Sequence, residues 1–130
     1  MPEYVVSRVI DALNEEGKAV KDARVLLLGI AYKPNVDDDR ESPSYEIMSL
    51  LAKRGARVAY NDPHVPEIKV GRCSKEFAGT RSAEITASYD VMVLCTQHLE
   101  YVDFDFSKIG VPLVDSRNCV QKKPSKYFKA

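Results

Sequence analysis

The chain has 130 residues, of which 45% are hydrophobic, and its 19 basic residues balance 19 acidic ones. This length is typical of one domain, which can bury about two-thirds of its unfolded surface. A balanced charge disfavours nucleic-acid binding, which usually needs a clustered basic face. The longest apolar run falls short of the roughly 18–20 residues that cross a bilayer, so we expect neither nucleic acid nor a membrane as a partner.

The cysteines indicate a reducing compartment. Cys73, Cys95 and Cys119 are odd in number and far apart, without a CxxC pair. This pattern favours free thiols over a disulfide framework. The N-terminus also lacks the apolar core of a signal peptide. We therefore expect a cytoplasmic location.

The first elements follow from apolar spacing. Residues 2–16 place five apolar side chains on one helical stripe, with Pro2 in the first turn and Gly17 after the end. Because this helix starts without a lead-in, we interpret it as the end of a longer helix. Its stripe would pack on this domain or on structure outside the chain. Residues 23–30 form an unalternated apolar run, as expected of a parallel strand covered on both faces.

A helix and further strands follow. Ser42 can cap a helix that has Pro43 at its first position, and Gly55 suits its C-terminal end. We predict strands at 57–61, 90–95 and 111–114, the first completing a right-handed βαβ unit. Residues 69–73 are predicted as a short edge strand, 82–88 as a short helix and 99–108 as a short helix or turn. The basic tail from Lys122 is predicted to be loosely held.

The expected fold is a three-layer α/β/α, Rossmann-like open sheet of about five mostly parallel strands, preceded by the N-terminal connecting helix. Ligands of such sheets bind beyond the carboxyl ends of the strands. Lys33 and Arg117 are each the first basic residue after a buried strand, and such a pair suits a phosphate or pyrophosphate. Tyr32 could lie against a base or sugar. The alternative is that Lys33 pairs with an aspartate of its own loop.

Three other chemistries fit the sequence poorly. A dinucleotide fingerprint needs glycines where Ala31 and Pro34 stand, so Asp62 is better interpreted as capping the turn into Pro63 than as a ribose ligand. The acidic run in residues 35–41 would need a glycine, not Arg40, to form a calcium loop. Cys95 and His98 could be two metal ligands or a nucleophile and its base, but no second ligand pair completes a zinc site, and Cys95 is better interpreted as an ordinary buried cysteine. We therefore predict that Asp38 or Asp39, with Arg40, holds the shape of the loop.

Residues 29–43 and 55–63, taken together, resemble the C-terminal domain of the UDP-glucose/GDP-mannose dehydrogenase family. The matching positions are Gly29, Tyr32, Lys33, Asp38, Arg40, Ser42, Gly55, Ala56, Val58, Asp62 and Pro63. The resemblance continues through residues 89–98 and 114–118. It implies a helix end at 1–17 that connects domains and a UDP-sugar-binding domain at 18–130.

The resemblance also implies a function. Full-length members are NAD-dependent oxidoreductases, expected to be homo-oligomers, that oxidise the C6 alcohol of a nucleotide sugar to a carboxylate. Tyr32, Lys33 and Arg117 would contact the nucleotide, whereas Asp38, Arg40 and Ser42 would shape the loop. NAD and the catalytic cysteine would belong to the rest of the dehydrogenase chain, so no catalytic or metal residue is assigned here.

Details near residues 42–44, 62–66 and 96–98 look most like the UDP-N-acetyl-D-glucosamine and UDP-N-acetyl-D-mannosamine 6-dehydrogenases, which serve polysaccharide biosynthesis. We expect this polypeptide alone to be inactive as a dehydrogenase. The alternative is a stand-alone nucleotide- or phosphate-binding or interaction module without catalysis.

Overall fold

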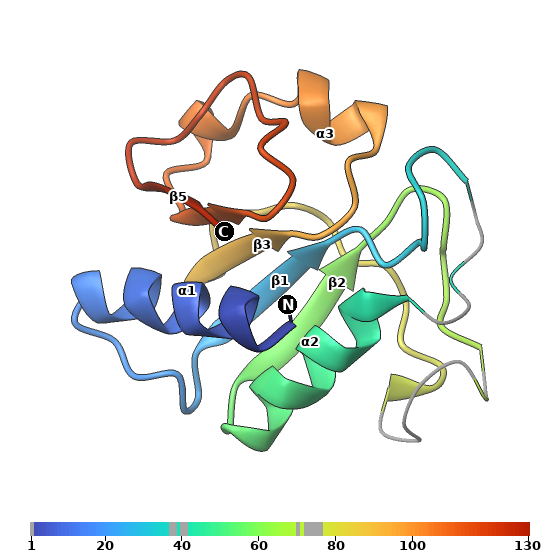
Figure 1. Ribbon diagram of the computed structural model, residues 1–130, viewed down its shortest axis with the longest axis horizontal. Helices are drawn as coiled ribbons and strands as arrows, with labels where there is room; N and C mark the ends of the chain where they lie inside the picture. The colour runs from blue at the N-terminus through green and yellow to red at the C-terminus, as the bar shows by residue number, and fades with distance from the viewer. Residues whose placement is uncertain (1, 37–38, 40–41, 70, 72–76) are drawn as a thin grey trace.

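The computed structural model describes residues 2–36, 39, 42–69, 71 and 77–130. Its centre is a five-stranded sheet in which every pair of neighbours is parallel and the order is β2-β1-β3-β4-β5 (Figure 1). The strands are β1 (Arg24–Leu28), β2 (Arg57–Asn61), β3 (Val91–Leu94), β4 (Leu113–Asp115) and β5 (Tyr127–Lys129). The helices are α1 (Pro2–Glu15), α2 (Pro43–Lys53), α3 (Leu99–Asp103) and the 3₁₀ helix η2 (Phe106–Lys108). The predicted Rossmann-like α/β class is confirmed.

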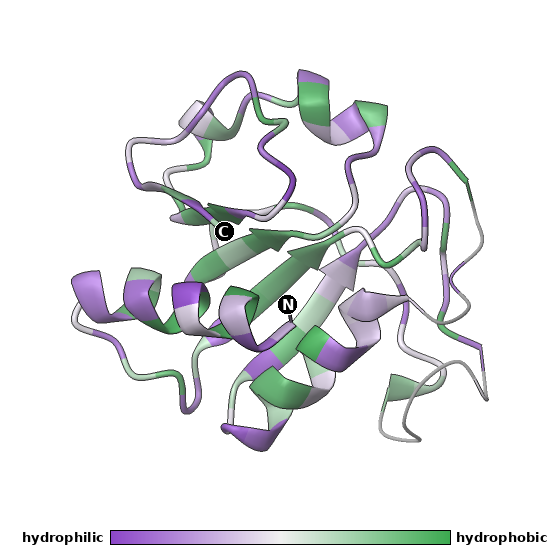
Figure 2. Ribbon diagram, viewed as in Figure 1, coloured by the Kyte–Doolittle hydropathy of each residue, from purple (hydrophilic) through white to green (hydrophobic). Residues whose placement is uncertain are grey.

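Two apolar layers enclose the sheet. Val25 and Leu27 of β1 belong to one core cluster with α1 and α2, whereas Leu26 and Leu28 belong to a second cluster with α3 and η2. Figure 1 shows α1 and α2 lying together across one face of the sheet. Most of β1 has the hydrophobic colour in Figure 2, as expected of a strand that is covered on both faces after its exposed first residue.

Helix α1 packs on this domain. Its buried residues are Val5, Val6, Val9, Ala12 and Leu13. They join the core cluster that contains α2, and the helix also contacts β3, β4 and β5. The apolar stripe of α1 therefore packs on this domain, which was the first of the two alternatives predicted from the sequence.

The start of α2 has the predicted cap. The hydroxyl of Ser42 accepts a hydrogen bond of 3.3 Å from the amide of Ser44, and Pro43 occupies the first turn. Because proline has no amide to leave unsatisfied, it fits this position without loss. The cap places the beginning of α2 beside the carboxyl end of β1, where the hydroxyl of Ser44 donates to the carbonyl of Gly29 at 3.1 Å.

The prediction of a loosely held tail is wrong. Residues 127–129 form β5, which pairs in parallel with β4. Phe128 packs against the cluster under α1, and Tyr127 packs against the opposite one. Tyr127 and Phe128 are too few, among basic neighbours, to give a recognisable strand pattern in the sequence. The strand is stabilised by its pairing with β4.

The prediction of a short helix over 82–88 is also wrong. The amide of Ala83 donates to the carbonyl of Tyr60 at 2.8 Å, and that of Ser82 to Pro66 at 3.0 Å. These long-range bonds hold the segment against β2 while Ala83 and Ile85 pack on the second cluster. The edge strand predicted at 69–73 lies largely outside the described residues. The element expected at 99–108 is confirmed as α3 and η2.

Candidate functional site

A cavity of about 260 Å³ lies beyond the carboxyl ends of β1, β3 and β4. Pro2 and Val5 of α1 close one side, and the beginning of α2 closes another. The polar or aromatic side chains in its lining are Tyr32, Ser42, Ser44, Cys95, Ser116 and Arg117. This is the edge at which open parallel sheets hold their ligands.

The structure brings Tyr32 and Ser42 into one cavity with Arg117, which is far from both in the sequence. Tyr32 is half exposed, with 49% of its surface accessible, so its ring is available to a ligand. The Nε atom of Arg117 donates to the carbonyl of Cys95 at 3.0 Å. This bond holds the guanidinium near the cavity and leaves its terminal nitrogens as further donors.

The other residues predicted for the site are Lys33, Asp38 and Arg40. Lys33 is exposed in the same loop as Tyr32, but the residues that line the cavity do not include it. Asp38 and Arg40 lie outside the described residues. Their neighbour Asp39 is buried and accepts a hydrogen bond from the hydroxyl of Tyr45 in α2.

Asp115 organises the loop that carries Arg117. Its carboxylate is fully buried, and its Oδ1 accepts from the amides of Arg117 at 2.9 Å and Asn118 at 2.8 Å. Its Oδ2 accepts from the amides of Cys119 and Val120 and from the hydroxyl of Tyr127. Five donors around one carboxylate fix the backbone of this loop. No role of its own was predicted for Asp115 from the sequence.

Asp62 has a corresponding role at the end of β2. Its Oδ2 accepts from the amides of Ile30 at 2.8 Å and Ala31 at 3.0 Å, and from Nε2 of His98 at 3.0 Å. Its Oδ1 accepts from the amide of His64 at 2.8 Å, which confirms the predicted cap of the turn at Pro63. Burial alone would raise the pKa of Asp62, but these hydrogen bonds, led by that from His98, hold it below its ordinary value.

The loop after β1 is attached to the loop after β3. The amide of Asn35 donates to Nδ1 of His98 at 2.7 Å, and the side-chain oxygen of Asn35 accepts from the amide of Leu99 at 2.9 Å. The hydroxyl of Thr96 donates to the carbonyl of Ala31 at 2.9 Å. Because Nδ1 accepts and Nε2 donates, His98 is a neutral ring in this arrangement.

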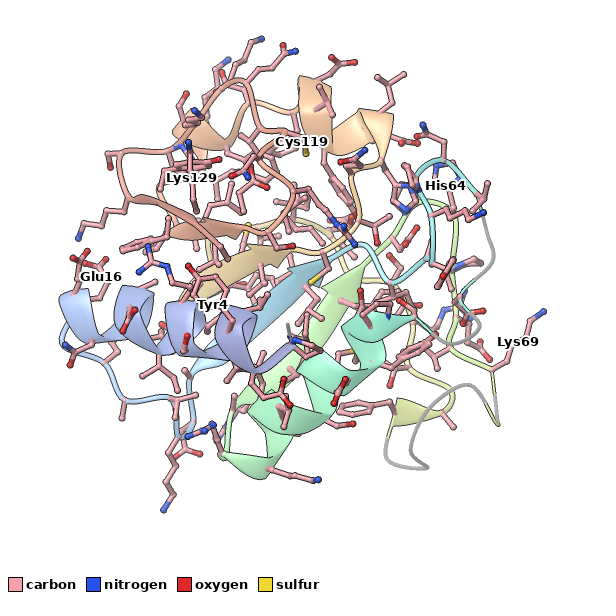
Figure 3. All side chains as sticks on the ribbon, in the orientation of Figure 1. Tyr4, Glu16, His64, Lys69, Cys119 and Lys129 are labelled. Carbon is pink, nitrogen blue, oxygen red and sulfur yellow. The ribbon has the colours of Figure 1, made fainter. Side chains whose placement is uncertain are left out.

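His98 and Asn35 therefore hold the loop that presents Tyr32. Sequence reasoning considered His98 only as a metal ligand or a base. The ring of His64 lies against that of His98, tilted by 48° with 4.5 Å between the centroids, and Figure 3 shows His64 beyond the ends of β1 and β2.

Gly29 permits this close approach. Its φ of +93° lies in the left-handed region that favours glycine. A Cβ atom at this position would stand 2.9 Å from the backbone nitrogen of Thr96, with the Thr96 side chain closer still. The glycine at the end of β1 thus serves contact between two protein loops.

The cavity offers little to nucleophilic chemistry. Cys95 is buried, and burial raises the pKa of its thiol to about 12. Such a thiol is a poor nucleophile at neutral pH.

Among the described residues, no group of three or more His, Cys, Asp or Glu side chains could hold a metal ion. None of the described helices is long and apolar enough to cross a membrane.

The surroundings of β1 do not fit a bound dinucleotide. A ribose at the end of β2 would need a free carboxylate, but that of Asp62 is buried and shared among four donors. The turn after β1 has Ala31 and Pro34 at positions where the fingerprint requires glycine. We therefore assign no step of any reaction to NAD in this chain.

The all-parallel sheet, with its cavity at the carboxyl edge, defines a Rossmann-like α/β domain. The model of the UDP-glucose/GDP-mannose dehydrogenase family, UDP binding domain, matches residues 26–122, and the chain belongs to this family. The resemblance in residues 29–43 and 55–63 is thereby confirmed.

Individual relatives of the chain are named as dehydrogenases of UDP-sugars. The chain is 35% identical over 98 residues to a UDP-N-acetyl-D-mannosamine dehydrogenase of Methanococcus maripaludis, which covers 75% of this chain and 21% of the relative. It is 31% identical over 115 residues to a UDP-glucose 6-dehydrogenase of Rhizobium meliloti, covering 82% and 25%.

Solved structures show the same fold. The UDP-D-ManNAc dehydrogenase of Pyrococcus horikoshii matches with a TM-score of 0.80 at 23% identity, over 98% of this chain and 30% of that one. A UDP-glucose dehydrogenase of Pyrobaculum islandicum matches with a TM-score of 0.74 at 27% identity, over 97% and 29%. The chain thus spans less than a third of the length of these relatives.

Proposed function

We propose that the chain binds the UDP part of a nucleotide sugar in the cavity between the beginning of α2 and the loop of Arg117. The observation that carries this proposal is that Tyr32 and Arg117 line one cavity within the segment that the family's UDP-binding model matches.

The chemistry of the lining suits a nucleoside diphosphate. Arg117 offers a planar set of donors to phosphate oxygens, and a charge-assisted hydrogen bond contributes about 1.5–3 kcal/mol. The beginning of α2 faces the cavity and adds the positive end of the helix dipole. The exposed ring of Tyr32 can lie against the base or ribose, and Lys33 in the same loop can approach the diphosphate. Asp38, Arg40 and Ser42 are proposed to hold the loop.

The cavity holds part of a nucleotide sugar. Its volume of about 260 Å³ lies below the range of about 300–1,000 Å³ that is usual for complete small-molecule pockets. A nucleotide sugar bound here would therefore extend its sugar beyond the described residues. This supports a division in which the chain binds the nucleotide and the sugar reacts elsewhere.

We propose that the chain serves an NAD-dependent dehydrogenase that oxidises the C6 alcohol of a UDP-sugar, a UDP-N-acetylhexosamine in particular. The names of the relatives support this, since they include dehydrogenases of UDP-N-acetyl-D-mannosamine and UDP-glucose. The pKa of the Cys95 thiol, raised by burial, and the misfit of NAD around β1 support placing both the nucleophile and the cofactor on other parts of the enzyme. Incubation of the chain with NAD and UDP-N-acetylglucosamine should accordingly yield no NADH.

Titration of isotope-labelled chain with UDP tests the binding proposal. We expect amide shifts concentrated in residues 29–36 and 115–118. Arg117→Gln should weaken binding about tenfold, which corresponds to about 1.4 kcal/mol. The control is Arg81→Gln, because Arg81 is an exposed partner of Glu67 and does not line the cavity. Equal affinity of wild type and Arg117→Gln, or shifts confined to other regions, would contradict the proposal.

Parallel titrations with uridine and with inorganic pyrophosphate separate the two halves of the ligand. Tyr32→Ala should mainly weaken uridine binding, and Arg117→Gln should mainly weaken pyrophosphate binding. If pyrophosphate alone bound as well as UDP, and Tyr32→Ala had no effect, the site would be a phosphate site without nucleoside recognition.

A further inference from the structure

We propose that Tyr127, in the last strand, is a positioning residue for Arg117 and acts through the carboxylate of Asp115. The inference rests on the proposed function for its consequence in binding, but not for the geometry of Arg117 itself. Tyr127 lies beyond residues 26–122, the segment matched by the family model.

The first step is the bond between the two strands. β5 pairs with β4 so that Leu113 stands opposite Tyr127 and Asp115 opposite Lys129. In this register the Tyr127 hydroxyl donates to Oδ2 of Asp115 at 2.8 Å. Burial, with the hydrogen bond to Asp115, raises the pKa of Tyr127 above its ordinary value, so the hydroxyl retains its proton and remains a donor.

The second step runs through the carboxylate. Oδ2 is fixed by Tyr127 at 2.8 Å and by the amides of Cys119 at 3.0 Å and Val120 at 3.2 Å, while Oδ1 receives the amide of Arg117 at 2.9 Å. Because both oxygens belong to one planar group, a donor that fixes Oδ2 also fixes the direction of Oδ1. The hydroxyl of Tyr127 is the donor from outside the loop, since the other four are amides of residues 117–120.

The third step reaches the guanidinium. Arg117 is attached twice, at its backbone through Asp115 and at Nε through the carbonyl of Cys95. If the amide of Arg117 lost its hydrogen bond to Asp115, the backbone at Arg117 would shift. Its Nε would then be less well placed to donate to the carbonyl of Cys95. Holding a long side chain in its binding geometry before the ligand arrives lowers the entropy lost on association.

Tyr127→Phe tests the proposal because it removes only the hydroxyl. The matched control is Tyr60→Phe, since Tyr60 also donates its hydroxyl within the fold, to the carbonyl of Val65 at 2.9 Å, but has no link to Arg117. We expect Tyr127→Phe to weaken UDP binding about fivefold. Both variants lose one hydrogen bond and some stability, but Tyr60→Phe should leave UDP binding unchanged. Unchanged UDP binding by Tyr127→Phe would overturn the proposal.

A double-mutant cycle separates positioning from general loosening. In the Arg117→Gln background, Tyr127→Phe should have no further effect on UDP affinity, whereas independent roles would give additive losses. Additive losses would overturn the proposal.

An NMR readout tests the geometry without any ligand. The Nε–H signal of Arg117 should be resolved in the wild type and in Tyr60→Phe, and should shift toward the value of a free arginine in Tyr127→Phe. If wild type fails to bind UDP, the proposed function fails, but this signal still decides whether Tyr127 positions Arg117. An unchanged Nε–H signal in Tyr127→Phe would overturn the positioning role.

Discussion

His98 donates from Nε2 to Oδ2 of Asp62 across 3.0 Å, and both side chains are fully shielded from solvent. Nδ1 of the same ring accepts the amide of Asn35, so the pair is a neutral histidine on a carboxylate. The pair joins the ends of β1, β2 and β3 at one point. We expect the stability of this edge of the sheet to depend on it.

Asp62→Asn should destabilise the protein strongly. The carboxylate accepts four hydrogen bonds, and an amide in its place turns an NH₂ group toward some of these donors. We expect a loss of about 3 kcal/mol in the free energy of unfolding, measured by urea denaturation. The matched control, Asp11→Asn, removes an exposed ion pair with Arg8 and should cost about 0.5 kcal/mol or less. Equal losses in the two variants would contradict this role of Asp62.

Stability should fall in acid partly through Asp62. Its pKa is below the ordinary value of 3.8, because the hydrogen bonds led by that from His98 outweigh the opposing effect of burial. A carboxyl group with a lowered folded-state pKa stabilises the fold above its unfolded pKa, and this contribution is lost as the pH falls through the folded-state value. Urea denaturation between about pH 7 and pH 3 should therefore show a loss that begins near pH 4 and continues below it.

The free energy of unfolding should depend less steeply on pH in Asp62→Asn than in the wild type. A remainder is expected, since the amide of Arg24 and the ammonium of Lys18 lower the pKa of Asp90 as well. Identical pH slopes in wild type and variant would show that Asp62 contributes nothing to acid sensitivity.

His98→Ala should release the loop that follows β1. The substitution removes the acceptor of the Asn35 amide, so exchange of that amide with solvent should become at least about tenfold faster, as measured by NMR. The cavity left by the ring and the loss of one of the three hydrogen bonds to Oδ2 of Asp62 should together cost about 3 kcal/mol. The control is His64→Ala, because the partly exposed ring of His64 lies against His98 but does not accept the Asn35 amide. Unchanged exchange at Asn35 in His98→Ala would contradict the attachment.

Gly29→Ala should be among the most damaging single changes at this edge. The new methyl group would collide with Thr96, and alanine is strained at a φ of +93°. We expect a loss of about 3 kcal/mol or more in thermal or urea unfolding. Gly110→Ala is a matched control, with a φ of +74° and no atom of the described residues within 4 Å of the added Cβ, so it should show only the backbone cost of about 1 kcal/mol. Similar losses in both would show that contact with Thr96 is unimportant.

Local sequence signals predicted much of the fold. The unbroken apolar runs of β1 and β3 indicate covered parallel strands, and Ser42 with Pro43 marks the beginning of α2. The convergence of Tyr32 and Arg117 was also predictable, because parallel strands all end at the same edge of a sheet. The roles assigned to Tyr32, Lys33 and Arg117 in binding remain predictions.

The features that were missed depend on partners distant in the sequence. β5 is too short to be recognised without β4 beside it, and residues 82–88 are held by bonds to β2 rather than by their own helical pattern. Asp115 looks like any polar residue after a strand until the loop folds around it. The same is true of His98, whose two nitrogens are satisfied by residues 63 and 36 positions away.

The meeting of α1 and β5 has a consequence for how the protein folds. Nε of Arg8 donates to the carbonyl of Lys129 at 2.9 Å, across a separation of 121 residues. Contacts between such distant segments slow folding, because a long loop must close before they form. Tyr127, the donor to Asp115 from outside the loop, lies in this last strand, so the fifth hydrogen bond of that carboxylate forms only after β5 has docked. We expect the Arg117 loop to mature in the slowest phase of refolding, so that ligand affinity appears after most of the helical signal has already returned.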